Sequence, residues 1–298
     1  MTKFCGAIPA LVTPLKADET LNAPVLRELM EDLLRQGADG FYIGGATGEG
    51  ISLKREVREE LAYEAVTLAK GKVPSIVHVA SANFHEAIEL AKQAERCGAD
   101  GISAIPPLFF AYDEDDVYNY YKELASSVHI PLMIYYSPMA KFPISAKFAA
   151  RMFEIDNVTA IKWTSSDYYG MQMLKDMTHG EMNIINGADE MLLMGLNAGA
   201  DGGIGTTYNI MQPTIKKIYE SFLARDTESA QAAQMHVVRV VEALLRYEGI
   251  PATKAVLEEI GYDVGNSTVP MKKYSTTEKR EIFEAAKKVG FVPVPKGK

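Results

Sequence analysis

The sequence predicts an α/β fold, a (β/α)8 barrel with a helical C-terminal extension, and two observations lead to this prediction. The phrase Gly-Ala-Asp-Gly occurs at residues 37–40, 98–101 and 199–202, each time between a helical pattern and an expected strand. Its first glycine fits the C-cap of a helix, so the phrase marks a junction from helix to strand. Eight strand candidates also alternate with helical patterns, as in a parallel sheet. An open doubly wound sheet has the same order, but eight regularly spaced units favour a closed barrel.

The expected strands are short apolar or β-branched stretches bounded by turn-forming residues. They are expected at residues 6–13, 40–45, 75–80, 101–106, 131–137, 158–164, 182–188 and 202–207. Helical periodicity alternates with them where leucine and other apolar residues repeat on one side. These helices are expected at residues 24–36, 55–70, 87–97 and 114–126.

The chain is expected to divide into a barrel over residues 1–223 and an extension over residues 224–298. No strand pattern follows the barrel, and helical patterns cover residues 227–247, 252–260 and 277–289. We therefore expect about three helices that pack on the side of the barrel. Because no linker separates them from it, they are not expected to form a second catalytic domain.

The overall composition excludes several classes of protein. The formal net charge of −8 argues against a general nucleic-acid or membrane-surface binder. Cys5 and Cys97 are the only cysteines and form no Cys/His cluster, so neither a disulfide framework nor a zinc site is indicated. His78 lies inside the third expected strand and is expected in the core or as a residue that supports a functional site. With no signal-peptide pattern or apolar run long enough to span a membrane, a cytoplasmic protein is expected.

Lys162 lies near the end of the sixth expected strand, in an apolar and β-branched stretch. A lysine is rarely buried unless it is paired, because moving an ammonium group out of water costs free energy. Apolar surroundings favour the neutral amine, which is a nucleophile that can form a Schiff base with a ketone. The alternative interpretation is that Lys162 reaches the surface from an ordinary strand end. The residues at the other strand ends decide between the two.

In a barrel of this kind the chemistry lies at the carboxyl ends of the strands. The second strand ends in a glycine-rich loop, residues 44–50, whose consecutive backbone N–H groups can form an anion-binding nest. A carboxylate would fit there, with the hydroxyl of Thr47 as a further donor. A plain glycine-rich turn is the alternative. The loop has neither the glycine spacing of a dinucleotide fingerprint nor the lysine of a P-loop.

Further polar side chains follow the fifth, seventh and eighth strands. Tyr135 and Tyr136 are adjacent, so one can point into the barrel mouth as a proton carrier while the other packs outside. Asp189 and Glu190 stand where a helix should begin, so they either cap that helix or bind a polyhydroxylated ligand. The hydroxyl of Thr206 is open to the same two interpretations. No group of carboxylates at these ends suggests a metal.

Together these strand ends resemble the pyruvate-dependent class I aldolases, the family of dihydrodipicolinate synthase and N-acetylneuraminate lyase. The resemblance covers essentially the whole chain. Gly-Gly-Ala-Thr-Gly-Glu at 44–49 is similar to the family's pyruvate-carboxylate loop, and Tyr-Tyr-Ser-Pro at 135–138 to its Tyr-x-x-Pro signature. Ile-Lys-Trp-Thr at 161–164 is similar to its Schiff-base segment. Motifs in this order at the ends of the right strands favour the nucleophilic interpretation of Lys162.

The resemblance implies a mechanism and a role for each residue. Lys162 would form an iminium with a small-molecule 2-oxo acid, and Tyr135, which the signature selects over Tyr136, would carry protons. The backbone N–H groups of Ala46 and Thr47, with the Thr47 hydroxyl, would hold the substrate carboxylate. The resemblance implies that no metal or organic cofactor takes part and that the protein is a homotetramer.

Within the family, the ends of strands seven and eight are similar to the pattern of N-acetylneuraminate lyases. There an acidic pair and a strand-eight hydroxyl bind the glycerol tail of the sugar. The substrate-binding residues expected on this basis are Thr164, Gly187, Asp189, Glu190 and Thr206. Dihydrodipicolinate synthases carry an arginine five residues after the tyrosine. Ala140 occupies that position here, with Lys141 beside it, which argues against synthase activity.

Three positions depart from the lyase pattern. Ala46 replaces a serine before Thr47, Phe110 lies where an aromatic hydroxyl is expected, and Thr206 replaces a serine. A different 2-oxo-3-deoxy sugar acid aldolase, or an enzyme more like dihydrodipicolinate synthase, is therefore kept as an alternative. A catalytically silent relative that binds a sugar acid for regulation is the alternative from a different functional class.

Overall fold

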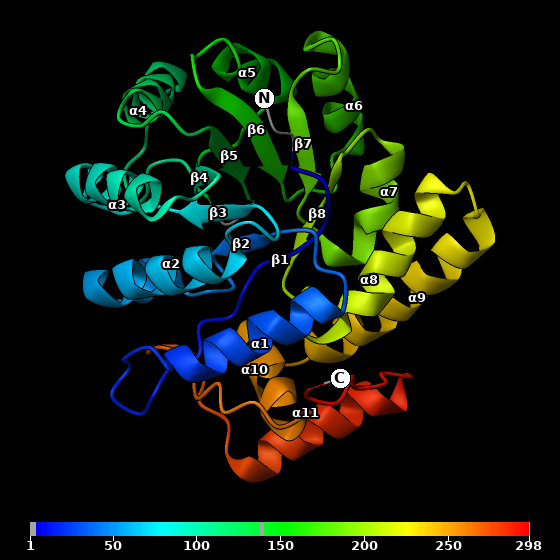
Figure 1. The fold of residues 1–298 in the computed structure, drawn as a ribbon. Coiled ribbons are helices and arrows are strands. Elements are labelled where there is room, and N and C mark those ends of the chain that lie inside the picture. Colours follow the sequence, from blue (N-terminus) through cyan, green and yellow to red (C-terminus); the bar gives the residue numbers. More distant parts are fainter. Residues whose placement is uncertain (1–3, 138–139, 298) are drawn as a thin grey trace.

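A computed structural model describes residues 4–137 and 140–297, and in these residues eight parallel strands form a barrel (Figure 1). The strands pair in the order β1-β8-β7-β6-β5-β4-β3-β2, and a parallel bridge between Ala10 and Tyr42 joins β1 to β2. This closed arrangement is the TIM, or (β/α)8, barrel, so the predicted fold class is confirmed. The strands are β1 Gly6–Pro9, β2 Phe41–Ile43, β3 Ser75–His78, β4 Gly101–Ala104, β5 Leu132–Tyr136, β6 Val158–Trp163, β7 Asn183–Asn186 and β8 Gly202–Gly205.

A ring of helices encloses the strands (Figure 1). Several begin at a side-chain cap that the sequence supplies, such as Asn83, which accepts the N–H of His85, and Asp113, which forms a capping box. The helices of the ring are α1 Ala23–Arg35, α2 Arg55–Ala69, α3 Phe84–Cys97, α4 Glu114–Ser126, α5 Ala146–Met152, α6 Tyr168–Met177, α7 Leu192–Asn197 and α8 Tyr208–Leu223. Two short 3-10 helices, η1 Gly50–Ser52 and η2 Asp189–Met191, lie at the strand ends.

The repeated Gly-Ala-Asp-Gly phrase ends a helix and also fastens a neighbouring strand. Its first glycine has a positive φ in all three copies, 88°, 90° and 102°, which suits a residue without a Cβ. Its aspartate accepts a backbone N–H from the start of a neighbouring strand, Ala7 for Asp39 at 2.8 Å and Ser75 for Asp100 at 2.8 Å. Asp201 accepts that of Ile184 at 3.0 Å. The phrase therefore closes the amino-terminal end of the barrel, opposite to the expected site.

The apolar core has two layers, because successive side chains of a strand point to opposite faces. The larger layer fills the space between the strands and the helices. The smaller layer lies inside the barrel and includes Tyr42, Met133, Ala160, Ile185 and Ile204. Residues two positions further along β5 and β6 share this inward face, and these are Tyr135 and Lys162.

Residues 224–297 form the helices α9 Thr227–Leu244, α10 Gly249–Glu259 and α11 Thr276–Lys288, without any strand. α9 packs against α8, and α10 packs against α11 (Figure 1). The carboxylate of Asp32 in α1 accepts the hydroxyl of Tyr262 and the N–H of Gly297, which ties the extension to the barrel. The extension was expected on the side of the barrel alone. It also reaches the strand ends, where α9 and α10 line a cavity.

Candidate active site

Lys162 is buried at the carboxyl end of β6, with 4% of its surface exposed. Its Nζ atom lies 4.3 Å from the centre of the Tyr135 ring and 4.7 Å from the centre of the Tyr42 ring. Aromatic faces attract a cation and also provide a low-dielectric surrounding for a neutral amine. The structure thus places the amine inside the barrel mouth, not at the outer surface where the alternative interpretation would put it.

The two tyrosines of β5 point to opposite sides of the strand, as strand alternation requires. Tyr135 faces the barrel interior, where its ring meets those of Tyr42 and His78 edge-on at 6.1 Å and 6.0 Å. Tyr136 packs outside against Trp163, with ring centres 4.9 Å apart. Tyr135 is therefore the tyrosine that lies next to the amine. Pro138, the last residue of the Tyr-x-x-Pro signature, lies outside the described residues.

The structure places Tyr42, His78 and Ser103 on the floor of the site. Sequence reasoning had assigned no role to Tyr42 or Ser103, and had expected His78 in the core or as a residue that supports the site. The hydroxyl of Tyr42 donates to Ser103 Oγ at 3.0 Å. Burial, together with the charges of Arg58 and Lys162, lowers the pKa of His78 to about 3, so the imidazole is neutral at ordinary pH. The signal for Tyr42 was present in the sequence, since a lone tyrosine between Phe41 and Ile43 must face the opposite side from both.

The glycine-rich loop of residues 44–50 lies against β1 and β8. Thr47 is buried, and its hydroxyl shares a hydrogen bond of 2.7 Å with that of Thr206. The hydroxyl of Thr13 donates to the Gly48 carbonyl at 2.6 Å. A Cβ atom on Gly50 would lie 1.8 Å from the Gly44 carbonyl oxygen, so the turn requires glycine there. These bonds join the loop to Thr13 and Thr206, which follow β1 and β8.

A cavity of about 250 Å³ lies between the ends of β6 to β8 and the extension. The residues expected to bind the distal part of the substrate all line it, and they are Thr164, Gly187, Asp189, Glu190 and Thr206. The opposite wall is mostly apolar and is formed by Val241, Leu244, Leu245, Gly249, Ile250 and Thr253. Among the described residues, the buried hydroxyl oxygen of Thr164 has no hydrogen-bond partner. This cavity therefore combines a polar wall on the barrel with an apolar wall on the extension.

Asp189 and Glu190 are placed differently within that cavity. Asp189 is buried, and its Oδ2 accepts both the N–H of Thr207 at 2.7 Å and its hydroxyl at 2.6 Å. Burial raises the pKa of Asp189 to about 6, although the bonds from Thr207 oppose the shift. Glu190 is only partly buried. Asp189 therefore joins η2 to the start of α8 in addition to lining the cavity. This role depends on Thr207, and sequence reasoning did not identify it.

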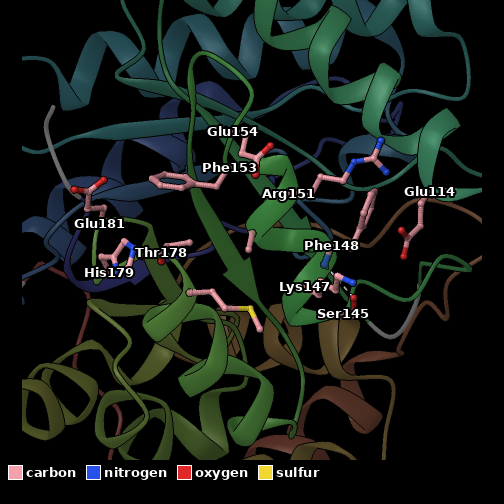
Figure 2. Close-up of a pocket in the computed structure, with 12 residues that line it drawn as sticks. Glu114, Ser145, Lys147, Phe148, Arg151, Phe153, Glu154, Thr178, His179 and Glu181 are labelled. Carbon is pink, nitrogen blue, oxygen red and sulfur yellow. Dashed lines mark hydrogen bonds between the residues drawn. The ribbon is translucent and has the colours of Figure 1, made fainter.

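A larger cavity, about 640 Å³, lies elsewhere, on the outer surface between α5 and α6. Figure 2 shows that Lys147, Phe148 and Arg151 line it from α5, while Thr178 and His179 follow α6. Its lining residues all lie outside the barrel strands, at whose carboxyl ends a barrel of this kind carries its chemistry. We therefore place the candidate site at Lys162 and not at this outer cavity.

The family model described as the dihydrodipicolinate synthetase family matches residues 3–289. The chain belongs to this family. An N-acetylneuraminate lyase of Rhizobium meliloti is 30% identical over 283 residues, which cover 95% of this chain and 94% of that protein. The structure of Proteus mirabilis N-acetylneuraminate lyase is similar with a TM-score of 0.92 and 30% identity, over 98% of this chain and 100% of that one. The structure of a Bacillus anthracis dihydrodipicolinate synthase is similar with a TM-score of 0.92 and 25% identity, over 99% of this chain and 100% of that one.

Members of this family are pyruvate-dependent lyases that form a Schiff base and need no cofactor, and the chain is therefore an enzyme of this class. Within residues 4–137 and 140–297, no group of His, Cys, Asp or Glu side chains is arranged to hold a metal ion. No helix in that part of the chain has both the length and the apolar character needed to cross a bilayer. Relatives named for both activities match, so the family alone leaves the substrate to be proposed.

Phe110, one departure from the lyase pattern, and Ala140, at the position of the synthase arginine, lie in two segments that Lys141 joins. Phe109 and Phe110, in the segment after β4, are 74% and 65% exposed. Lys141 Nζ donates to the carbonyl of Phe109 at 3.4 Å and lies 5.6 Å from the centre of its ring. Ala140 is buried next to it. No guanidinium stands at that position, and the neighbouring ammonium is engaged with the segment after β4.

Proposed function

We propose that the protein cleaves N-acetylneuraminate to pyruvate and N-acetylmannosamine through a Schiff base on Lys162. The observation that carries the proposal is the position of the buried Lys162 amine, which lies against Tyr135 at the mouth of the barrel. The similarity to relatives named N-acetylneuraminate lyase supports the choice of substrate.

The reaction follows from the residues around the amine. The Lys162 amine, in its unprotonated form, adds to the C2 ketone of the substrate, and loss of water leaves an iminium. Tyr135 removes the proton of the C4 hydroxyl, the C3–C4 bond breaks, and its electron pair moves to the iminium. The products of this step are an aldehyde and an enamine. Protonation of the enamine at C3 and hydrolysis then release pyruvate and the free lysine.

The loop of residues 44–50 and the cavity of about 250 Å³ would hold the two ends of the substrate. Backbone N–H groups of Ala46 and Thr47, with the Thr47 hydroxyl, would bind the carboxylate. The free hydroxyl of Thr164 and the carboxylates of Asp189 and Glu190 would bind the distal hydroxyls, since a carboxylate accepts such hydrogen bonds strongly. Ala140 leaves no guanidinium for the second carboxylate that dihydrodipicolinate synthesis requires.

A panel of 2-oxo acids, assayed for release of pyruvate, tests this substrate choice. We expect the largest kcat/KM for N-acetylneuraminate and little condensation of pyruvate with aspartate semialdehyde. A site built to bind distal hydroxyls disfavours substrates that lack them. A larger kcat/KM for a six-carbon 2-oxo-3-deoxy acid would contradict the assignment. Binding of the sugar acid without turnover would instead indicate the silent relative.

A second candidate is a lyase for a shorter 2-oxo-3-deoxy sugar acid. It is favoured by Ala46 and Phe110, which remove two hydroxyls that the lyase pattern places near the reacting centre. The same panel separates the two candidates, because only the nine-carbon substrate extends to Asp189 and Glu190. We also propose that the enzyme is a cytoplasmic homotetramer that acts on small molecules and binds neither nucleic acid nor membrane.

A further inference from the structure

A buried ion pair joins the glycine-rich loop to the helical extension. Glu49 Oε1 lies 2.6 Å from Lys254 Nζ, and the two side chains are 0% and 2% exposed. Glu49 is the residue just before η1, and Lys254 lies in α10. Buried charges of this kind are rare and are tolerated only when they are paired. This pair is therefore a specific link between two distant segments of the chain.

Further hydrogen bonds fix both ends of the link. Glu49 Oε2 accepts the N–H of Thr268 at 2.6 Å, and Lys254 Nζ donates to the carbonyl of Asn266 at 3.2 Å. Burial lowers the pKa of Lys254, an effect that Glu49 opposes. The segment after α10 thus holds the carboxylate from one side while Lys254 holds it from the other.

The backbone of Glu49 transmits this link to the carboxylate-binding turn. Its φ of 58° is left-handed, which residues other than glycine seldom adopt unless their surroundings hold them there. Its N–H donates to the carbonyl of Ala46 at 2.9 Å, and its own carbonyl accepts the N–H of Ser52 at 2.8 Å. The turn that carries Ala46 and Thr47 is therefore closed by a residue whose side chain is anchored in the extension.

We propose that Glu49 and Lys254 are positioning residues, which hold the backbone of Ala46 and Thr47 in the orientation that receives the substrate carboxylate. The helical extension thereby contributes a positioning residue to the active site. Neither side chain touches the substrate. Replacing a buried ion pair by an apolar pair of similar volume is often neutral or stabilising, so stability alone does not account for these charges. The inference rests on the proposed role of this loop in binding a 2-oxo acid.

The test compares two probes in the Lys254→Met variant. Imine formation is trapped with sodium cyanoborohydride, and the adduct on Lys162 is measured by mass spectrometry against pyruvate or methyl pyruvate concentration. We expect the half-saturating pyruvate concentration to rise about tenfold or more, since displacement of a binding group by about 1 Å costs up to about 100-fold. The value for methyl pyruvate should stay within about twofold, because the ester carries no charge for the loop to bind.

Two further variants separate positioning from general stability. Lys279→Met removes another ion pair of the extension, that with Glu258, and should change neither probe. The double variant Glu49→Gln/Lys254→Met leaves no unpaired buried charge, so it should fold at least as well as Lys254→Met and keep the pyruvate-specific defect. It carries the test if the single variant does not fold. If neither variant folds, the pair is a general stability element and the proposal is overturned.

Equal losses for both probes, or an unchanged pyruvate value, also overturn the proposal. In either case a wild-type adduct on Lys162 leaves the proposed function standing. A wild-type protein that forms no adduct with pyruvate overturns the proposed function and this inference with it.

Discussion

At the level of single residues, two adjacent tyrosines have different positions, one at the candidate site and one in the packing between strands and helices. Tyr135 lies against the Lys162 amine inside the barrel, whereas Tyr136 packs outside against Trp163. Only a one-residue shift in strand register would exchange them. We therefore propose that the hydroxyl of Tyr135 is the one that transfers protons at the substrate.

Removal of each hydroxyl in turn tests this assignment. Tyr135→Phe should keep the fold and lower kcat by about 10²–10⁴-fold, the usual range for a lost acid–base group. Tyr136→Phe is the matched control and should change kcat by less than about threefold, because its ring packing is preserved. Steady-state pyruvate release measures both. A larger loss for Tyr136→Phe would show that the wrong face of β5 carries the proton.

Asp189 makes the stability of the fold depend on pH. Burial raises its pKa from 3.8 to about 6, so the folded protein binds a proton that the unfolded chain releases between these values. The free energy of unfolding should therefore fall as the pH rises from about 4 to about 6, by about 3 kcal/mol from this group. Asp189→Asn should remove this fall in the free energy of unfolding. Urea unfolding at pH 4 and pH 7 measures the change in the free energy of unfolding between these two pH values. The same change in wild type and variant would contradict the prediction.

At the level of the elements, two glycines line the cavity beside the strand ends. A Cβ atom on Gly187 would lie 1.9 Å from Thr164 Oγ1, so β7 can approach the end of β6 only with glycine at that position. Gly249, at the start of α10, lines the same cavity but has no atom within 4 Å of its Cβ position. The two glycines therefore differ in packing while they share one cavity.

This difference predicts opposite results for the same substitution. Gly187→Ala should destabilise the fold by about 1–3 kcal/mol, the cost of overpacking, and raise KM for N-acetylneuraminate. Gly249→Ala should leave stability within about 0.5 kcal/mol or raise it slightly, since alanine favours a helix. Thermal unfolding and pyruvate release measure both effects. Tolerance of Gly187→Ala would mean that the junction of β6 and β7 can shift.

The choice of Tyr135 as the inward tyrosine came from the resemblance to the family. Sequence patterns predicted each strand and the opposite orientations of Tyr135 and Tyr136, because both follow from local periodicity. They did not predict where regular pairing stops. The first strand was expected to residue 13 but ends at Pro9, and of residues 10–13 only Ala10 forms a bridge. The third helix begins at Phe84 and not at residue 87, because the Asn83 side chain caps it. Strand ends and caps depend on contacts that periodicity does not contain.

The parts of the site that the sequence left out all depend on contacts between distant segments. Tyr42 meets Lys162 only when β2 and β6 enter one barrel interior. Thr207 binds Asp189 across the ends of β7 and β8. Lys254 lies far along the chain from Glu49, in a helix whose sequence pattern gives no sign of a buried ion pair. No local pattern marks such pairs, so only the folded chain reveals them.

For the whole molecule, we predict a homotetramer in solution, as the resemblance to the family implies. The exposed Phe109 and Phe110 beside the site are the kind of apolar surface that a neighbouring subunit covers. Light scattering coupled to size-exclusion chromatography should give about four times the mass of one chain. A mass that stays at one chain across micromolar concentrations would contradict this prediction.

The central claim is that Lys162 is the nucleophile of a Schiff-base lyase, and covalent trapping tests it most directly. The folded protein is treated with pyruvate and borohydride, and its peptides are mapped by mass spectrometry, with Lys162→Met as the control. We predict one reduced pyruvate adduct, located on Lys162 and absent from the control. An adduct on another lysine, or none in the folded wild-type protein, would contradict the account.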